Sequence, residues 1–209
     1  FGQADGKCGD NLTWTLNNGK QEITGTGAMY AYRYGSYWGR EEVTSVVISE
    51  GVTSIGDSAF SSCENLTSVS IPSTVTTIGE WAFNFCNKLT EITIPKSVTK
   101  IGESAFASCD GLTEIVIPDG VTGIGGYAFY SCSKLADVTI PSSVTSIGDA
   151  AFSGTARALT IHGYSGSYAQ TYAKNNSITF DAIGGVTYPL ISSVQVNVAP
   201  AAAGKSVTP

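Results

Sequence analysis

LTSVSIPSTVTTIGEWAFNFCNK, residues 66–88, is one unit of a pattern that recurs along the chain at a constant step of 23 residues. Each unit contains an isoleucine–glycine pair followed by an alanine–phenylalanine pair. Five phenylalanines keep the step: Phe60, Phe83, Phe106, Phe129 and Phe152. A unit of this length cannot enclose its own apolar side chains, whereas stacked units can. The repeat therefore predicts a solenoid with one continuous core.

The first six residues of the unit predict a short β-strand. Leu66, Val69 and Ile71 have the L-x-x-L-x-L spacing of a leucine-rich repeat, which turns apolar side chains into the core. Pro72 ends the strand because proline cannot donate to a strand ladder. We expect stacked strands to form a parallel sheet that lines one surface, with neighbours about 4.7–4.9 Å apart.

The return leg of the unit predicts a short helical turn, because Ile78, Ala82 and Cys86 are spaced by four residues. The expected fold is therefore an α/β-type repeat solenoid. It is a right-handed leucine-rich-repeat solenoid with a parallel β-sheet on one face and five 23-residue turns over residues 43–157.

The flanks are expected to cap the exposed ends of the core. Residues 1–42 are the predicted N-terminal cap, in which apolar and polar residues alternate across Asn17-Asn18-Gly19 and predict a β-hairpin. The N-terminal cap also holds a cluster of aromatic residues: Tyr32, Tyr34, Tyr37 and Trp38. These side chains are either a lid on the first turn or a platform for a sugar or protein partner.

The C-terminal cap is predicted over residues 158–183. It should contain a strand, a helix near Tyr168–Lys174 and a last strand at Ile178–Phe180, which makes it an αβ cap. Residues 184–209 predict a linker or the first strand of a following domain that is cut off. The chain is therefore expected to be an excised part of a longer, processed protein.

Four cysteines occupy equivalent places in successive units: Cys63, Cys86, Cys109 and Cys132. A column spread over successive turns cannot converge on one zinc ion, and parallel side chains do not readily form the torsion of a disulfide. The fifth unit has Thr155 in this place, which a packing role tolerates. We expect these cysteines to be buried thiols and no metal to bind them, whereas the role of Cys8 stays open.

Composition excludes several classes of partner. The formal charge is −6 and the sequence pI is about 4.7, so the chain has no cationic excess to bind nucleic acid or anionic lipid. No apolar run reaches the roughly 18–20 residues that span a bilayer, so no direct membrane insertion is expected. We also expect a monomer without a cofactor.

The sheet surface is the first candidate binding face, because a parallel solenoid sheet exposes two columns of side chains. The candidate residues of these columns are Ser68, Ser70, Glu91, Thr93, Glu114, Val116, Asp137 and Thr139. Glu91, Glu114 and Asp137 form an acidic row that favours a cationic segment of a partner or a calcium ion. The alternative is a solvated face without a ligand.

Aromatic residues on the return leg are the second candidate face. They occur in some units and are replaced by serine or alanine in others: Trp81, Phe85, Tyr127 and Tyr130. They form either an exposed apolar contact patch or packing against neighbouring loops.

Catalytic patterns are missing from the sequence. His162 is the single histidine and is expected to be a surface or turn residue rather than a base. There is no Ser/His/Asp set, no phosphate-binding glycine loop with lysine and no H-E-x-x-H motif. The sequence therefore predicts no catalytic residues and no enzyme activity.

With its repeat and flanks together, the chain resembles the BspA-like leucine-rich-repeat proteins of bacterial cell surfaces. The resemblance rests on the opening CG-x-NLTWTL with GTGAM, the repeated IP-x-x-V-x-x-IG-x-x-AF-x-x-C unit and the closing HGY-x-GS-x-A-x-TYA. It implies secretion or surface display. It also implies a binding or adhesion role toward a protein or glycan, such as host extracellular matrix or another bacterial surface, without catalysis.

Two other functions remain open. The chain could be a rigid spacer that presents a neighbouring domain of a larger surface protein. It could also belong to a carbohydrate-active enzyme whose catalytic domain lies downstream.

Overall fold

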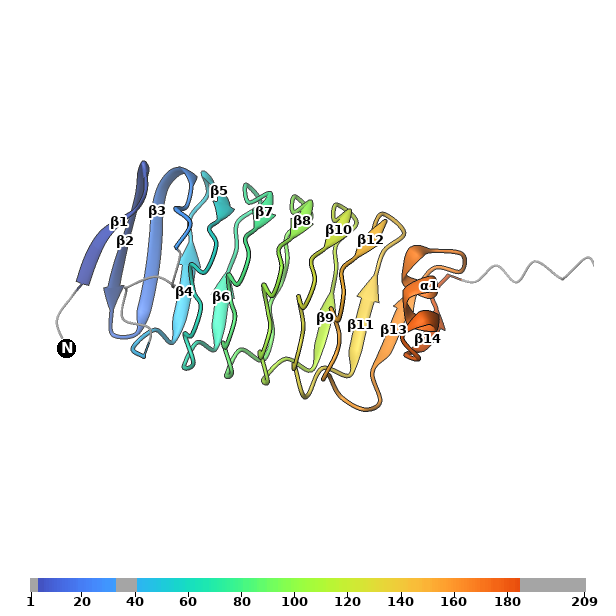
Figure 1. The fold of residues 1–209 in the computed structure, drawn as a ribbon. Helices are drawn as coiled ribbons and strands as arrows, with labels where there is room; N and C mark the ends of the chain where they lie inside the picture. Colours follow the sequence, from blue (N-terminus) through green and yellow to red (C-terminus); the bar gives the residue numbers. More distant parts are fainter. Residues whose placement is uncertain (1–3, 33–40, 185–209) are drawn as a thin grey trace, which may run out of the picture.

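The computed structural model describes residues 4–32 and 41–184, which form an elongated solenoid. Figure 1 shows successive coils stacked along one axis, with the N-terminal strands at one end and the helix α1 at the other. The predicted solenoid, its parallel sheet and its two caps are confirmed.

Three antiparallel strands begin the fold. β2 (Asn11–Asn17) and β3 (Lys20–Ala28) form the predicted hairpin. Asn18 and Gly19 of its turn have φ angles of 48° and 81°, in the left-handed region that asparagine and glycine tolerate. β1 (Ala4–Gly9) pairs with β2 and adds a strand beyond the predicted hairpin.

Each cap also contributes to the solenoid itself. β3 pairs in parallel with both β4 (Ser45–Ile48) and β5 (Val52–Ile55), so the first coil begins inside the N-terminal cap. At the other end, β13 (Thr160–Gly163) and β14 (Thr179–Ala182) extend the sheet beyond β11 (Asp137–Ile140). The solenoid therefore has about seven turns, against the five predicted from the repeat.

Two ladders of parallel strands join the coils. The first follows the isoleucines that precede the repeated glycines and is continuous; its strands are β5, β7 (Thr77–Ile78), β8 (Lys100–Ile101), β10 (Gly123–Ile124) and β12 (Ser146–Ile147). The second ladder is the front sheet, which comprises β4, β6 (Ser68–Ser70), β9 (Glu114–Val116), β11, β13 and β14.

The front sheet is interrupted at residues 91–93, which form no strand although their sequence fits the strand pattern. The stacked phenylalanines of the core are 5.3 Å apart, a wider step than the about 4.7–4.9 Å between hydrogen-bonded strands. The same 5.3 Å step occurs where the front-sheet strands do pair, so this difference does not account for the interruption.

The predicted helical turn on the return leg is wrong, because residues 79–86 and their equivalents form tight turns instead. Trp81, Phe83 and Phe85 donate their N–H groups to carbonyls of the next coil at 2.8–2.9 Å. Asn84 bonds three residues back along its own chain. In an α-helix all of these N–H groups would bond four residues back, so hydrogen bonds between coils override the four-residue spacing.

The repeated phenylalanines form one stack along the solenoid axis. Neighbouring ring centroids from Phe60 to Phe152 are 5.3 Å apart at every step, and the rings are inclined by 2–15°. Tyr172 of α1 (Tyr168–Asn175) ends the stack with its ring edge-on to Phe152 at 5.9 Å. The C-terminal cap therefore docks on the same column of aromatic rings that fills the solenoid.

All five cysteines are buried thiols, which confirms the prediction for the repeated four. Cys86, Cys109 and Cys132 each donate from Sγ to the carbonyl of the phenylalanine 26 residues earlier, at 3.1–3.3 Å. Burial raises the pKa of Cys132 to about 12, so its thiol stays protonated and unreactive at neutral pH. The cysteine column is therefore a packing feature that also pairs with backbone carbonyls.

The C-terminal cap has the predicted order of strand, helix and strand. Ser167 caps α1, because its Oγ accepts a hydrogen bond from the N–H of Gln170 at 3.4 Å. Ala169, Tyr172 and Ala173 form the buried side of the helix. Within residues 4–32 and 41–184, no helix has the length and apolar character needed to cross a membrane.

Candidate binding surfaces

The front sheet presents the two predicted columns of outward side chains. Pairing in register aligns Glu114 with Asp137 and Val116 with Thr139. Seven of the eight candidate residues are exposed: Ser68, Ser70, Glu91, Thr93, Glu114, Val116 and Asp137. Thr139 is half-buried.

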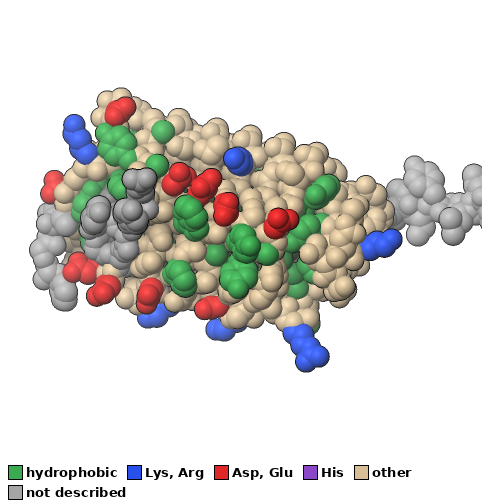
Figure 2. All heavy atoms as spheres, viewed as in Figure 1, with side chains coloured by type: hydrophobic (Ala, Val, Ile, Leu, Met, Phe, Trp, Pro, Cys, Tyr) green, Lys and Arg blue, Asp and Glu red, His purple; other side chains and the backbone are tan. Residues whose placement is uncertain are grey.

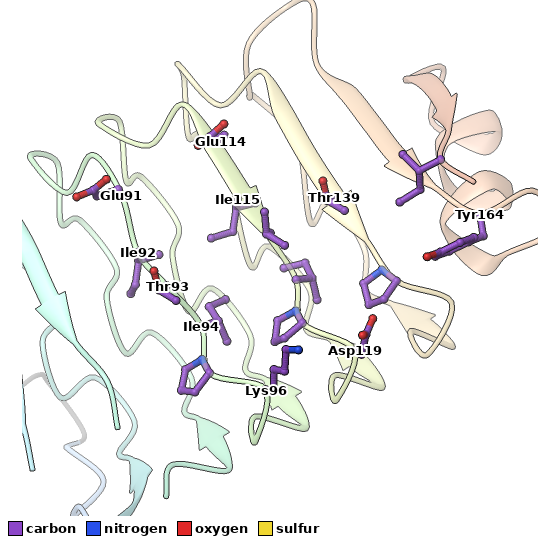
Figure 3. Close-up of a pocket in the computed structure, with 16 residues that line it drawn as sticks. Glu91, Ile92, Thr93, Ile94, Lys96, Glu114, Ile115, Asp119, Thr139 and Tyr164 are labelled. Carbon is purple, nitrogen blue, oxygen red and sulfur yellow. The ribbon is translucent and has the colours of Figure 1, made fainter. Parts of the chain in front are cut away.

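A groove of about 590 Å³ runs across this face over the third, fourth and fifth repeat units. Five of the candidate residues line it: Glu91, Thr93, Glu114, Val116 and Thr139. In Figure 3, Glu91 and Glu114 lie along one rim and Tyr164 closes the end toward the C-terminal cap. The volume is in the range of small-ligand sites, about 300–1,000 Å³.

The groove combines an apolar floor with a charged rim. Val116 is 62% exposed and is the most open large apolar side chain in the described residues. Ile92, Ile115 and three prolines of the repeat add further apolar lining. The repeat predicted the rim residues, whereas the contribution of Tyr164 comes from the cap and has no equivalent in the repeat.

The acidic row does not form a calcium site in the described residues. Glu91, Glu114 and Asp137 stand one to a coil, and no group of three or more His, Cys, Asp or Glu side chains in residues 4–32 and 41–184 is placed to hold a metal ion.

His162 lies on the front sheet rather than in a turn. Its Nε2 is 3.0 Å from Oδ1 of Asp137 on β11, and its Nδ1 is 3.1 Å from Oδ2 of Asp181 on β14. The hydrogen bond to Asp137 is the main cause that raises the pKa of His162 above its ordinary value, with a further contribution from Asp181. The 23-residue step from Thr139 to His162 is the sequence signal for this position.

We expect His162 to make the cap more stable at low pH. The folded pKa is raised, so the stabilisation is fully present below the unfolded value of about 6.5 and is lost as pH rises through the folded pKa. His162→Gln should lower the free energy of unfolding by roughly 0.5–1 kcal/mol at pH 5.5, since exposed ion pairs are weak, and by less at pH 8.5. Thermal unfolding at both pH values measures this, and an equal effect of the variant at both would contradict it.

The aromatic candidates divide into three groups. Tyr34, Tyr37 and Trp38 lie outside the described residues. Tyr32 is half-buried and packs against the core, as a lid would. The four return-leg aromatics are exposed rather than packed: Trp81 (42%), Phe85 (49%), Tyr127 (43%) and Tyr130 (41%).

Comparison with known proteins identifies the repeat. Residues 33–158 match the family described as BspA type leucine rich repeat region, in six copies. No curated protein matches the chain. A leucine-rich repeat protein of Treponema pallidum shares the fold, with a TM-score of 0.63 and 22% identity over 81% of this chain and 95% of that one.

Two solved structures are more similar in sequence. A leucine-rich repeat protein from Bacteroides ovatus is 31% identical over 73% of this chain, with a TM-score of 0.58. A leucine rich cell surface protein from Faecalibacterium prausnitzii is 28% identical over 84% of this chain, with a TM-score of 0.60. The chain spans 46% and 54% of the length of these two proteins. Because the matched repeat covers more than half of its residues, the chain belongs to the BspA-type leucine-rich-repeat family.

Proposed function

We propose that the chain is a non-catalytic binding module at or beyond the bacterial cell surface, and that it recognises a protein or glycan partner through the front sheet. The groove of about 590 Å³ is the observation that carries this proposal. The family is one of repeat solenoids, and the similar protein from Faecalibacterium prausnitzii is named as a cell surface protein. Both facts support a surface location and a binding role.

The groove favours partners with both apolar and cationic groups. The exposed side chain of Val116 offers a surface for apolar or aromatic groups, and the carboxylates of Glu91 and Glu114 attract positive charge along one rim. Lys96 and Asp119 also line the groove, so polar groups border it at more than one place. A polypeptide segment with lysine or arginine beside an apolar residue matches this arrangement best.

A rigid spacer is the second candidate, and the continuous phenylalanine stack favours it. Five rings at a constant step of 5.3 Å, sealed by Tyr172, join the repeat and the C-terminal cap into one body. Such a body would hold a neighbouring domain at a set distance without any ligand of its own.

Charge reversal in the groove separates the two functions. We expect Glu91→Lys/Glu114→Lys to weaken binding to immobilised extracellular-matrix proteins or mucin by about tenfold or more, because it removes two attractive contacts and adds two repulsive ones. Biolayer interferometry on a panel of these proteins measures the effect, and the wild-type interaction should weaken at high ionic strength.

Glu42→Lys/Glu64→Lys is the matched control, since both residues are exposed, lie outside the groove and change the net charge equally. The control should bind like the wild type. Equal loss in both double variants would show that net charge alone determines binding. Binding of the wild type to none of the panel would favour the spacer.

A further inference from the structure

A second surface lies on the turn segments that follow the repeated isoleucines. We define the turn face as the exposed side chains of five segments: residues 56–63, 79–86, 102–109, 125–132 and 148–155. The four exposed aromatics of the return leg lie on it, two in the second repeat unit and two in the fourth. Figure 2 shows hydrophobic side chains gathered beside a row of acidic ones on one face of the solenoid.

The aromatic residues occupy backbone positions that are unfavourable for large side chains. Trp81, Phe85 and Tyr127 have φ angles of 52°, 58° and 56°, in the left-handed region. The equivalent places in other units hold smaller residues: Ser58, Ser62, Ser104, Ser108, Ser131, Ala150 and Gly154. The fold is therefore built equally well without these rings, and each of these residues keeps 42–49% of its surface exposed. Strained and exposed side chains of this kind point to a contact role.

The rings flank the third unit. Trp81 and Tyr127 belong to the units on either side of it, two steps of the 5.3 Å phenylalanine stack apart. The third unit has small residues at the equivalent places, of which Ser104 (8% exposed) and Ala107 (4% exposed) are buried. Tyr127 is held against Tyr130, whose ring lies edge-on at 5.6 Å. The turn face therefore has exposed aromatic surface on both sides of the third unit.

The charged residues of the five turn segments are all acidic. Glu80 and Glu103 are exposed and come directly before Trp81 and Ser104 in their units, and Asp57 and Asp149 occupy the same place in the first and fifth units. The five turn segments contain no Lys, Arg or His. Within these segments no cation neutralises the row, whereas Lys100 of β8 lines a pocket together with Asp57 and Glu80.

We propose that the turn face binds a cationic polypeptide segment, with arginine or lysine side chains stacked on the exposed Trp81 and Tyr127 rings. The aromatic faces attract the cation. Glu80 lies in the same unit as Trp81, and Glu103 lies in the unit before that of Tyr127, so carboxylates accompany both rings. Arginine fits best because its planar group stacks on rings and bonds carboxylates. This surface shares no residue with the groove and does not depend on it.

Titration with an octa-arginine peptide tests the proposal. We expect Trp81→Ser/Tyr127→Ser to weaken binding at least about tenfold, although the net charge of the chain is unchanged. Serine already occupies this place in the first and third units, so the variant should keep the wild-type melting temperature, which circular dichroism verifies. Tyr168→Ser is the matched control, because Tyr168 is 42% exposed on α1, away from the turn face.

Four outcomes would overturn the proposal. Absence of octa-arginine binding to the wild type would contradict it directly. Binding of the double variant as tight as that of the wild type would assign binding to net charge. Loss with Glu91→Lys/Glu114→Lys but not with the aromatic variant would place the peptide in the groove. Finally, binding of a neutral chito-oligosaccharide that only the aromatic variant abolishes, without peptide binding, would assign the turn face to glycans.

Discussion

Phe83→Ala is expected to lower the free energy of unfolding by about 3–5 kcal/mol. The Phe83 ring has no exposed surface and lies 5.3 Å from the rings of both Phe60 and Phe106. Removing it leaves a cavity in the middle of the stack, which the neighbouring coils cannot close because hydrogen bonds hold them at a constant step. Since small proteins are stable by about 5–15 kcal/mol, the loss is a large share of the total. Urea unfolding measures it.

Phe85→Ala is the matched control, because it makes the same chemical change two residues further along the same turn segment. Phe85 is 49% exposed, so its loss should change stability by less than about 0.5 kcal/mol. Similar losses in both variants would show that the phenylalanine stack has no special part in stability.

Gly102→Ala is expected to destabilise the fold by about 2–3 kcal/mol, although alanine is otherwise the best-tolerated replacement for glycine. A Cβ at Gly102 would lie 2.6 Å from the backbone nitrogen of Glu80 and 2.6 Å from the carbonyl carbon of Gly79. Both atoms are backbone atoms of the preceding coil, so neither can rotate away. The coils must separate locally, which weakens the continuous ladder at β7 and β8. Thermal and urea unfolding both report this loss.

Gly126→Ala provides the comparison for this effect. A Cβ there would meet its nearest atom, the carbonyl oxygen of Asp149, at 3.4 Å, which is an ordinary contact. The substitution should be neutral or stabilise by up to about 1 kcal/mol, because alanine reduces the freedom of the unfolded chain. If Gly102→Ala were tolerated as well as Gly126→Ala, the close approach of the coils would not be the reason for the repeated glycine.

The sequence alone was sufficient to predict the solenoid, because a strict repeat imposes the same environment on every equivalent residue. Phe83 and its equivalents must all be buried if one of them is, and Glu114 and Asp137 must share a column if the step is constant. The same reasoning correctly predicted the buried thiols. The hairpin and the cap helix followed from local signals, namely Asn18-Gly19 and the tyrosine–alanine segment near Tyr168.

The features that distinguish one unit from another depended on tertiary structure. Residues 91–93 fit the strand pattern, yet they form no strand, a difference that the repeat does not indicate. Ile78, Ala82 and Cys86 fit a helical spacing, yet hydrogen bonds between coils impose tight turns with left-handed residues instead.

For the candidate sites as well, the repeat predicted some residues and only the tertiary structure revealed the others. The repeat identified the residues of each column, including the exposed Glu91, Glu114 and Val116. It contained no information on Tyr164, which reaches the groove from the cap, or on Asp181, which meets His162 from β14. A periodic sequence determines which residues are equivalent and which are buried. Only the contacts between coils and caps decide which exposed side chains come together, because those contacts join segments that the period does not relate.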